Sequence, residues 1–375
     1  MTPRVERVAL NAMFLAPGDS GGPETYLREL VRALAGEYPG LGISVLTTGA
    51  GERSLREDGF DELAVLRALR AEEYRRLQRQ LAEQVLVQVH ARRARADLLH
   101  SLASTGPVRT PRLRSVVTLH DATFMQTPTF GRVTTWGMTQ VVQRAARDAD
   151  ALIAVSEAAR DELCAALGLD PSRFTVVPHG LGAVPRAEPA PEASVRDRLG
   201  LGDGSIVLCV GAVRPHKNQE LLVRALPHLP NAVTIVLAGR HEGYDHRVRE
   251  LAAELGVTER LRLPGYLPDA DLERLWTLAG CAAFPTRAEG FGLPVLEGMA
   301  RGVPVACSDI PVLREVGGDV PLYFDPADPA AAAAAIVAAL GDGERGRRGA
   351  ERAGSFSWAD AARGTMEAYE RALVA

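Results

Sequence analysis

The fold is indicated first by the stretch Pro285-Thr-Arg-Ala-Glu289-Gly-Phe-Gly-Leu-Pro294-Val-Leu-Glu297-Gly-Met-Ala, which follows an apolar strand pattern and opens a helical one. Pro294 suits the first turn of a helix, because the N–H that proline lacks has no partner there. Gly290 and Gly292 allow the backbone to approach a ligand closely, and the free amides of a new helix attract an anion such as phosphate. The stretch therefore predicts a strand–loop–helix unit with an anion-binding turn.

The same alternation of strands and helices extends outward over the whole chain. Expected strands are Val5–Phe14, Ile43–Thr47, Leu98–Ser101, Val116–His120, Ala151–Val155, Thr175–Val177, Ser205–Gly211, Val233–Gly239, Arg260–Leu263, Cys281–Pro285, Val303–Cys307 and Leu322–Phe324. Expected helices are Glu24–Tyr38, Glu72–Arg93, Val133–Arg147, Glu157–Leu167, Asn218–His228, His246–Leu255, Asp269–Ala279, Pro294–Arg301 and Pro329–Leu340. Near-continuous apolar strands alternating with helices are typical of an α/β fold, with parallel sheets covered on both faces.

A Pro-, Ala- and Gly-rich segment after His179 interrupts the alternation, which then restarts near Ser205. We therefore predict two α/β domains of ordinary size, at residues 1–180 and 201–357, joined by a linker at residues 181–200. A final helical pattern covers residues 358–375. Whether this last helix packs on the second domain or returns to the first stays open.

Composition excludes several classes of protein. The 375 residues carry 43 basic and 47 acidic side chains, a balance that argues against a nucleic-acid partner. No apolar run approaches the ~20 residues that a membrane span needs, and the first strand pattern is no signal peptide, so we expect a cytoplasmic protein. The four cysteines are far apart and predict buried free thiols instead of a zinc site. Lys217 is the single lysine among the basic residues.

Glu289 and Glu297 flank the glycine-containing turn, eight residues apart. On one helix they would lie ~12 Å apart along the axis. Retaining glycosidases hold their two carboxyl groups about 5 Å apart, so this pair fits hydrolysis poorly. It better suits gripping an elongated ligand at two places, with phosphates between them. In isolation, Glu297 would be only a helix-dipole partner and Glu289 a solvated charge, but the strand–loop–helix context favours ligand binding.

Two further groups of polar residues follow expected strands. Arg214 and Lys217 lie three residues apart just past a strand end, where both can reach one anion, although two solvated cations on a loop are common. His120 ends another buried strand, directly before Asp121. A lone histidine in such a place is more often structural than functional.

The quoted stretch, Glu289-Gly-Phe-Gly-Leu-Pro-Val-Leu-Glu297, resembles the E-x7-E element of retaining family-4 glycosyltransferases, which have the GT-B fold. Four other segments resemble motifs of that family in the same order; they are Gly18-Asp-Ser-Gly21-Gly22, Thr118-Leu-His120-Asp121, Ala154-Val-Ser156-Glu157 and Val210-Gly211-Ala-Val-Arg214-Pro-His-Lys217-Asn218. The resemblance covers nearly the whole chain. It implies two Rossmann-like doubly wound domains facing across a cleft, with the acceptor on the first and a nucleotide sugar on the second.

The resemblance also implies roles for single residues. Arg214, Lys217 and the amides of Gly21 and Gly22 would meet the diphosphate. Glu289 and the turn of Gly290, Phe291, Gly292 and Leu293 would hold the donor sugar, Glu297 the ribose, and the backbone at Tyr266 the base. His120 would bind the donor sugar or orient the acceptor. In one departure from the family's pattern, His179 stands in the Val177-Pro178-His179-Gly180 segment where many relatives have Asn.

The expected activity is transfer of a hexose-type sugar from a nucleotide diphosphate, with retention, without a metal and without a separate cofactor. The resemblance slightly favours GDP-mannose over UDP- and dTDP-sugars as the donor. A saccharide, a lipid-linked sugar or a small natural product could be the acceptor. The Arg-rich stretch Leu66–Arg95 fits a solvated surface helix, or more weakly a peripheral contact with the inner face of a membrane.

Other classes of two-domain α/β protein make different demands on the sequence. An NAD-type oxidoreductase would need G-x-G-x-x-G after the first strand and an acidic residue at the end of the second, and both are absent. A solute-binding protein would need an export signal. A sugar-nucleotide epimerase, a phosphorylase or a catalytically silent binding subunit of the same architecture stays open.

Overall fold

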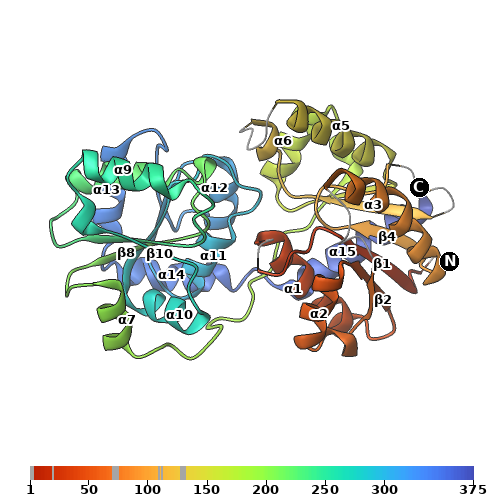
Figure 1. Cartoon of the computed structure of the whole chain (residues 1–375), viewed down its shortest axis with the longest axis horizontal. Helices are drawn as coiled ribbons and strands as arrows, with labels where there is room; N and C mark the ends of the chain where they lie inside the picture. Colours follow the sequence, from red (N-terminus) through yellow and green to blue (C-terminus); the bar gives the residue numbers. More distant parts are fainter. Residues whose placement is uncertain (1–3, 19–20, 70–75, 109, 111–112, 127–131) are drawn as a thin grey trace. The chain divides into compact units, whose positions relative to one another are not determined.

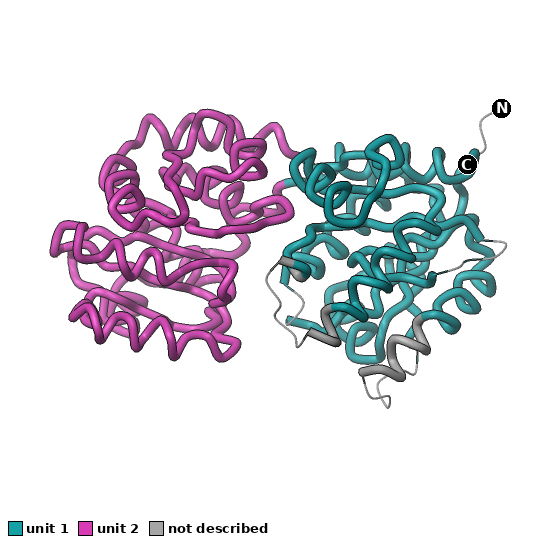
Figure 2. The backbone as a smooth tube through the Cα atoms, turned by 90° about the horizontal axis from the view of Figure 1, so that it is seen from above, with its two compact units in different colours: residues 1–180, 357–375 teal, residues 181–356 magenta. Residues whose placement is uncertain are grey.

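The computed structural model describes residues 4–18, 21–69, 76–108, 110, 113–126 and 132–375. The chain divides into two compact units, shown in different colours in Figure 2. Unit 1 consists of residues 1–180 and 357–375, and unit 2 of residues 181–356. Each unit is an α/β assembly around its own parallel sheet, and the two are described separately.

Unit 1 is built on a seven-stranded sheet with the order β3-β2-β1-β4-β5-β6-β7. All neighbouring strands are parallel. The strands are β1 (Arg7–Ala12), β2 (Gly42–Thr47), β3 (Val65–Ala68), β4 (Leu98–Ser101), β5 (Arg114–Leu119), β6 (Ala151–Ala154) and β7 (Phe174–Val176). The chain first proceeds outward from β1 to β3 and then returns to β4, so the order reverses between β1 and β4. This reversal is the place where open α/β sheets bind ligands.

Helices cover both faces of this sheet, because alternate strand residues point to opposite faces and both sets are apolar. One core cluster joins strand residues such as Val8 and Leu10 to helices α1 (Gly22–Glu37), α2 (Gly49–Glu57) and α15 (Trp358–Val374). On the other face, strand residues pack against α3 (Arg76–Arg93), α5 (Arg132–Asp148) and α6 (Glu157–Leu167). The short α4 (Thr123–Gln126) follows β5. Figure 1 shows α1, α2 and α15 on the side of the sheet opposite to α5 and α6.

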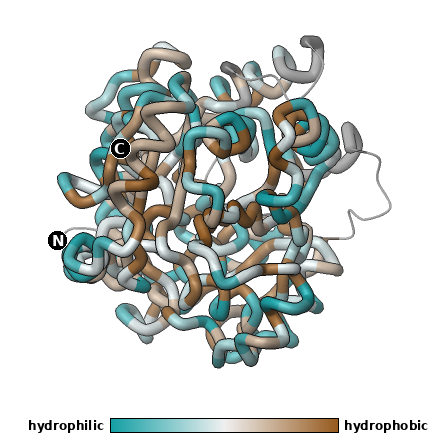
Figure 3. Tube along the Cα trace, turned by 90° about the vertical axis from the view of Figure 1, so that its left-hand side faces the viewer, coloured by the Kyte–Doolittle hydropathy of each residue, from teal (hydrophilic) through white to brown (hydrophobic). Residues whose placement is uncertain are grey.

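Unit 2 is built on a six-stranded parallel sheet with the order β10-β9-β8-β11-β12-β13. The strands are β8 (Ile206–Val210), β9 (Thr234–Ala238), β10 (Leu261–Gly265), β11 (Ala279–Phe284), β12 (Val305–Ser308) and β13 (Leu322–Phe324). The helices are α7 (Glu192–Leu199), α8 (Gln219–Ala225), α9 (Asp245–Glu254), α10 (Asp269–Leu278), α11 (Leu293–Ala300), α12 (Pro311–Gly317), α13 (Pro329–Ala339) and α14 (Gly343–Ala353). Figure 3, a view onto unit 2, shows brown hydrophobic segments among teal hydrophilic ones. The strand order reverses between β8 and β11.

The expected class, two Rossmann-like doubly wound α/β layers, is confirmed. All twelve expected strands are present, and β3 is an additional strand that the sequence pattern did not reveal. The helical pattern expected from Glu72 is observed from Arg76, because residues 72–75 lie outside the described part. The segment 181–200, treated above as a linker, contains α7 and lies in unit 2. Helix α15, which the sequence left unassigned, belongs to unit 1.

Two further findings concern the chain as a whole. Within the described part, no helix combines the length and the apolarity that crossing a membrane requires. All four cysteines are free; Cys209, Cys281 and Cys307 are buried and Cys164 is half-buried.

Candidate functional site

The loops that follow β8 and β11 carry most of the residues that the sequence singled out. Because β8 and β11 are neighbours at the reversal point of the unit 2 sheet, their carboxyl ends place these two loops side by side. The loop after β8 carries Arg214 and Lys217, and the loop after β11 carries Glu289 and the glycine turn. The fold therefore joins two segments that lie 72 residues apart in the sequence.

Backbone geometry shapes the loop after β8. Gly211 adopts a φ of 144°, and its carbonyl lies so close to Gly239 that a Cβ there would be 2.0 Å from the oxygen. A 3-10 turn, Pro215–Lys217, then leads to Asn218, which has a left-handed φ of 57°. The Asn218 side chain donates hydrogen bonds of 2.9 Å to the carbonyls of Pro285 and Pro326. This buried amide fixes the loop that carries Lys217 against the end of β11.

The two loops are joined a second time at the carbonyl of His216. The backbone N–H of Arg287 and the hydroxyl of Thr286 both donate to this oxygen, at 2.8 and 3.1 Å. Beyond this junction, Lys217 Nζ lies 2.5 Å from Glu289 Oε1. The lysine and glutamate side chains are 24% and 15% exposed, so the ion pair is largely shielded from water. Lys217, which we expect to bind phosphate, and Glu289, which we expect to bind the sugar, are therefore in direct contact.

Arg214 points to a different carboxylate. Its Nε and Nη2 donate to the two oxygens of Glu242, at 2.6 and 2.7 Å. Glu242 follows β9, and both side chains of this pair are more than a third exposed. Arg214 and Lys217 are thus on the same loop but hold separate partners in this structure. The sequence contained no signal for Glu242, since it lies on a loop without a recognised motif.

The glycine turn leads directly into α11. Gly292 has a φ of 99°, and a Cβ on it would lie 2.6 Å from Leu313 Cδ2, so any side chain here would be strained and would displace Leu313. Phe291 is buried, and its ring meets Phe356 edge to face, with centroids 5.8 Å apart. The buried Phe291 ring and the close approach of Leu313 to Gly292 hold the turn, which leads directly to the amides of the first turn of α11.

Glu297 lies on α11 within a group of four charged residues. Its carboxylate forms an ion pair with Arg186, whose side chain comes from the segment before α7. Arg301, one helical turn further, donates to the Glu297 carbonyl at 3.0 Å and to the carboxylate of Glu273 at 2.5 and 2.9 Å. Burial raises the pKa of Glu297, and Arg186 and Arg301 counteract that effect. Arg186, Glu273 and Arg301 stand in no motif recognised in the sequence.

Tyr266 directly follows β10 and is 67% exposed. The guanidinium of Arg240, which follows β9, lies 5.3 Å from the centre of its ring, within cation–π distance. Gly265, with a φ of 79°, makes the turn between the strand and this tyrosine. The exposed Tyr266 lies beside Arg240 at the ends of β9 and β10.

In unit 1, His120 lies at the carboxyl end of β5. Its Nε2 donates to the Leu102 carbonyl at 2.7 Å, which assigns the proton to Nε2 and leaves Nδ1 as an acceptor in the neutral ring. The ring meets Tyr26 edge to face at 5.1 Å and His179 at 5.6 Å. Burial lowers the pKa of His120, against opposing effects of the Leu102 carbonyl and Asp121. The neutral imidazole therefore dominates at neutral pH.

A series of buried, hydrogen-bonded side chains lies near His120, and no sequence motif predicts it. His100 Nε2 lies 2.7 Å from Thr118 Oγ1, which lies 3.1 Å from the Tyr26 hydroxyl. The other His100 nitrogen lies 2.8 Å from the hydroxyl of Tyr369 on α15. Burial lowers the pKa of His100 to about 3 and raises that of Tyr26 to about 12, so both are neutral.

His179 packs against Tyr26, one of these hydrogen-bonded residues. It is 4% exposed, and its ring centre lies 4.9 Å from Tyr26 and 5.5 Å from Trp358. Gly180, the next residue, touches the backbone of Trp358 so closely that a Cβ would lie 2.1 Å from the Trp358 nitrogen. The end of the first chain segment of unit 1 is thereby packed against α15.

The predicted glycines of the first loop also lie in unit 1. Gly21 has a φ of 57° and precedes α1, whose first residue is Gly22. A Cβ on either would meet no atom of the described chain within 4 Å. Residues 19 and 20 of the same loop lie outside the description. Among the described residues, no group of three or more His, Cys, Asp or Glu side chains could hold a metal ion.

The two doubly wound parallel sheets, with polar loops at the reversal point of each, define the GT-B class of fold. Solved structures of this class align over almost the entire chain. A structure of HepE from Anabaena in complex with UDP and glucose aligns with a TM-score of 0.74 and 19% identity, over 96% of this chain and 98% of that one. Sucrose-phosphate synthase from Thermosynechococcus elongatus aligns with a TM-score of 0.76 and 21% identity, over 97% and 98%. At these identities the likeness establishes the fold.

Sequence comparison establishes the family. Residues 20–182 match the model of Glycosyltransferase Family 4, and residues 193–355 match that of Glycosyl transferases group 1. The O-antigen chain mannosyltransferase B of Escherichia coli is 31% identical over 68% of this chain and 70% of its own length. A D-inositol 3-phosphate glycosyltransferase of Nocardia farcinica is 34% identical over 60% of this chain and 53% of its own. The chain belongs to the family-4 glycosyltransferases, and spans little more than half of this second relative.

Proposed function

We propose that the protein transfers a hexose-type sugar from a nucleotide diphosphate sugar to a hydroxyl group, with retention of the anomeric configuration. The observation that supports this best is the contact of Lys217 with Glu289 beside the glycine turn, at the reversal point of the unit 2 sheet. A cation, a carboxylate and helix amides at one place suit a ligand that carries a diphosphate next to a sugar. Membership in a glycosyltransferase family makes the nucleotide sugar the natural candidate.

Each proposed role follows from the chemistry of donor cleavage. Negative charge develops on the leaving phosphate, where Lys217, Arg214 and the amides of Gly21 and Gly22 would stabilise it without a divalent metal. Binding of the diphosphate would take Lys217 from Glu289, so that the carboxylate becomes an acceptor for sugar hydroxyls. Glu297 would accept hydrogen bonds from the ribose, and the segment at Tyr266 would contact the base. In the front-face mechanism, the departing phosphate receives the proton of the acceptor.

We assign His120 to the sugar or the acceptor, with its Nδ1 as a hydrogen-bond acceptor, and Gly21 and Gly22 to the phosphates. For the donor we favour GDP-mannose, since a mannosyltransferase is among the similar proteins; UDP- and dTDP-sugars come next. UDP is the nucleotide in the structure of HepE. For the acceptor we propose a saccharide, a lipid-linked sugar or a small natural product, and we propose no separate cofactor.

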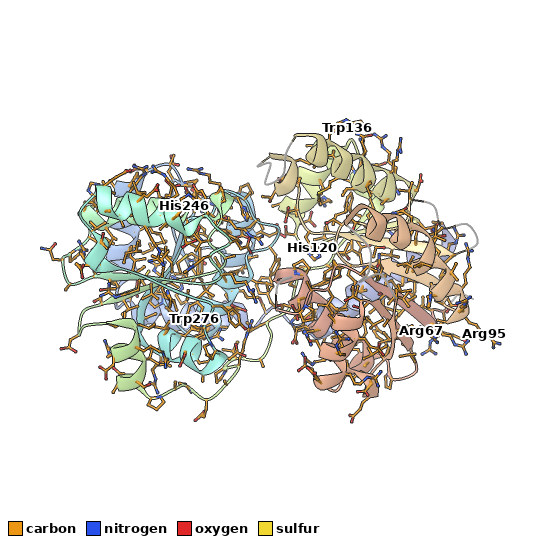
Figure 4. The ribbon with its side chains drawn as sticks, viewed as in Figure 1. Arg67, Arg95, His120, Trp136, His246 and Trp276 are labelled. Atoms are coloured by element: carbon orange, nitrogen blue, oxygen red, sulfur yellow. The ribbon has the colours of Figure 1, made fainter. Side chains whose placement is uncertain are left out.

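A weak peripheral membrane contact is a minor part of this proposal. The Arg-rich stretch is divided in the structure between β3 and α3, with residues 70–75 outside the description. Figure 4 labels Arg67 and Arg95 of this stretch and also Trp136 on α5, which is 67% exposed. Cosedimentation with anionic vesicles at low and high salt tests the contact. Absence of binding at low salt removes it.

A thermal-shift panel of GDP, UDP, dTDP and ADP tests the main proposal. A ligand at 100 times its dissociation constant stabilises the folded protein by about 2.7 kcal/mol, which such a panel detects. The matching nucleotide sugar is then incubated with simple saccharide acceptors with and without EDTA, and NMR reports the anomeric configuration of the product. Retention and activity in EDTA are expected. An inverted product contradicts the proposed mechanism, and no shift with any nucleotide contradicts the donor assignment.

A further inference from the structure

Four residues form a line of alternating charge in unit 2, in the order Arg186, Glu297, Arg301 and Glu273. Arg186 comes from the segment before α7, Glu273 from α10, and Glu297 and Arg301 from α11. Only Glu297 was assigned a ligand above. The positions of Arg186, Arg301 and Glu273 determine the orientation and the charge of the Glu297 carboxylate.

Glu273 and Arg301 form a closed pair. Their side chains are 4% and 7% exposed. Glu273 Oε1 accepts from Arg301 Nη2 at 2.5 Å and Oε2 accepts from Arg301 Nε at 2.9 Å. The remaining Arg301 nitrogen, Nη1, donates to the Glu297 carbonyl, and the guanidinium lies over the Trp276 ring at 5.1 Å. The two opposite charges are buried and paired with each other, so this pair serves as a rigid base for its neighbours.

Arg186 is anchored on that base through its backbone. Its N–H donates to Glu273 Oε1 at 2.9 Å, which fixes the chain without using the side chain. The guanidinium then extends to Glu297 Oε1 and remains 36% exposed, while the Glu297 side chain is 16% exposed. The side chain of Arg186 can therefore be changed while the backbone hydrogen bond that holds the segment is kept.

We propose that Arg186 is a positioning residue that holds the Glu297 carboxylate in the orientation in which it accepts hydrogen bonds from the two hydroxyls of a ribose. A carboxylate has about four lone-pair sites, so Oε1 can accept from Arg186 and from one hydroxyl at once, leaving Oε2 for the other. This inference rests on the proposed function, because it takes the ligand of Glu297 to be the ribose of a nucleoside diphosphate.

Electrostatics gives Arg186 a second effect on Glu297. Burial raises the pKa of Glu297, as do the carboxylates of Glu273 and Asp269 on α10, while Arg186 and Arg301 lower it. Since Arg301 is committed to Glu273, Arg186 is the cation whose side chain directly contacts the Glu297 carboxylate. Without it the folded pKa of Glu297 rises further. The fraction of ionised acceptor then falls as the pH falls, and binding of the ribose weakens on the acid side.

The test compares ribose-containing and ribose-deficient ligands. We would measure dissociation constants of GDP and 2′,3′-dideoxy-GDP by calorimetry, or of the UDP pair if the panel selects UDP. The wild type should bind the ribonucleotide at least about 10-fold more tightly, since hydrogen bonds to a charged group contribute about 1.5–3 kcal/mol. In Arg186→Gln the preference should fall to about 2-fold, with binding of the dideoxy ligand unchanged. Arg186→Lys should keep an intermediate preference.

Two controls separate positioning from general disturbance. Arg198, whose Nη2 lies 2.6 Å from Asp271, ties α7 to α10 by a similar ion pair, so Arg198→Gln is the matched variant and should keep the wild-type preference. In a Glu297→Gln background, Arg186→Gln should have no further effect on the preference, because coupled residues are not additive. In the Arg186→Gln variant alone, the preference should grow as the pH rises from 5.5 to 8.5, whereas that of the wild type changes little.

The outcomes are distinguishable. If no nucleoside diphosphate binds the wild type, the proposed function fails. If the wild type binds both ligands equally, or if Arg186→Gln keeps the full preference, nucleotide binding stands and the assignment of Arg186 is overturned. Loss of folding in Arg186→Gln would contradict the statement that the backbone, not the side chain, anchors the segment; the Arg186→Lys measurement then decides the positioning role.

Discussion

At the scale of single residues, Lys217 is the clearest case of a residue type that its surroundings demand. It is the single lysine beside 42 arginines, and its ammonium lies 2.5 Å from Glu289 in a pair largely shielded from water. A compact ammonium contacts Glu289 from this fixed loop, whereas a planar guanidinium is larger and needs a different geometry. The preference of the chain for arginine elsewhere and the packing of this loop therefore both indicate that position 217 requires a lysine.

We expect Lys217→Arg to lower kcat/KM by about 10-fold or more, because the longer, forked side chain cannot keep the position of the ammonium beside the phosphates. Steady-state kinetics with the nucleotide sugar identified by the panel measures this effect. The matched control is Arg214→Lys on the same loop. Because Glu242, the partner of Arg214, is far more exposed than Glu289, this variant should lower kcat/KM less than Lys217→Arg does. Near-wild-type activity of Lys217→Arg would mean that any cation suffices there.

His120 is expected to affect turnover more than binding of the donor. His120→Ala should lower kcat while the dissociation constant of the nucleoside diphosphate changes little, and Glu297→Ala should do the reverse. Calorimetry and steady-state kinetics on the same preparations separate the two. Equal loss of nucleotide binding in both variants would contradict this division of roles.

The pH dependence of His120 follows from the direction of its shift. Burial lowers its folded pKa below the usual 6.5, so the neutral ring is kept from alkaline pH down through 6.5, and is lost only as the pH falls through the lower folded value. We expect kcat/KM to stay level from pH 8 to 6.5 and to decline only below that range. This limb should be absent from the residual activity of His120→Ala. A decline already centred at or above pH 6.5 would contradict a buried, neutral His120.

At the scale of elements, the turn into α11 depends on Gly292. Any other residue meets a positive φ of 99° and a contact with Leu313 Cδ2 at 2.6 Å. We expect Gly292→Ala to destabilise unit 2 by about 2–4 kcal/mol, the sum of left-handed strain and overpacking. Chemical denaturation measures the loss. Gly343→Ala, at the open first position of α14, is the control and should be within about 0.5 kcal/mol of wild type.

The individual strands and helices show which parts of the fold could be predicted from the sequence. The quoted stretch and the loop after β8 were recognisable because each follows an apolar strand, and the parallel order then had to bring their ends together. β3 was missed because its residues are half-exposed to exposed at the sheet edge, so they show no strong apolar run. α7 was missed because it stands among prolines and buries only Val195.

The charged group around Glu297 could be predicted only in small part. Arg301 stands four residues after Glu297, a spacing that places both on one helix face and could have been noticed. Arg186 lies 111 residues from Glu297, in a segment whose composition suggests a loose linker, and Glu273 lies in another helix. Only the three-dimensional path of the chain brings these three elements together, and no local pattern records it.

At the scale of the whole molecule, each unit has its own sheet and cores, and α15 belongs to unit 1 although it follows the whole of unit 2 in the chain. The hydroxyl of Tyr369 on α15 reaches the buried His100, and that of Tyr323 on β13 donates to the Gly318 carbonyl at 2.7 Å. A Tyr→Phe substitution at these two positions therefore removes a hydrogen-bonded hydroxyl from each unit in turn.

We expect Tyr369→Phe to destabilise unit 1 by about 1–3 kcal/mol, because it leaves a buried histidine nitrogen without its partner, and to leave unit 2 unchanged. Tyr323→Phe should destabilise unit 2 alone. Hydrogen–deuterium exchange resolved by peptide measures both: protection should fall across β1, β4 and β5 in the first variant and across β12 and β13 in the second. Loss of protection in both units from either substitution would show that the two sheets unfold as one cooperative body, since local stability is lost only within the unit that contains the broken contact.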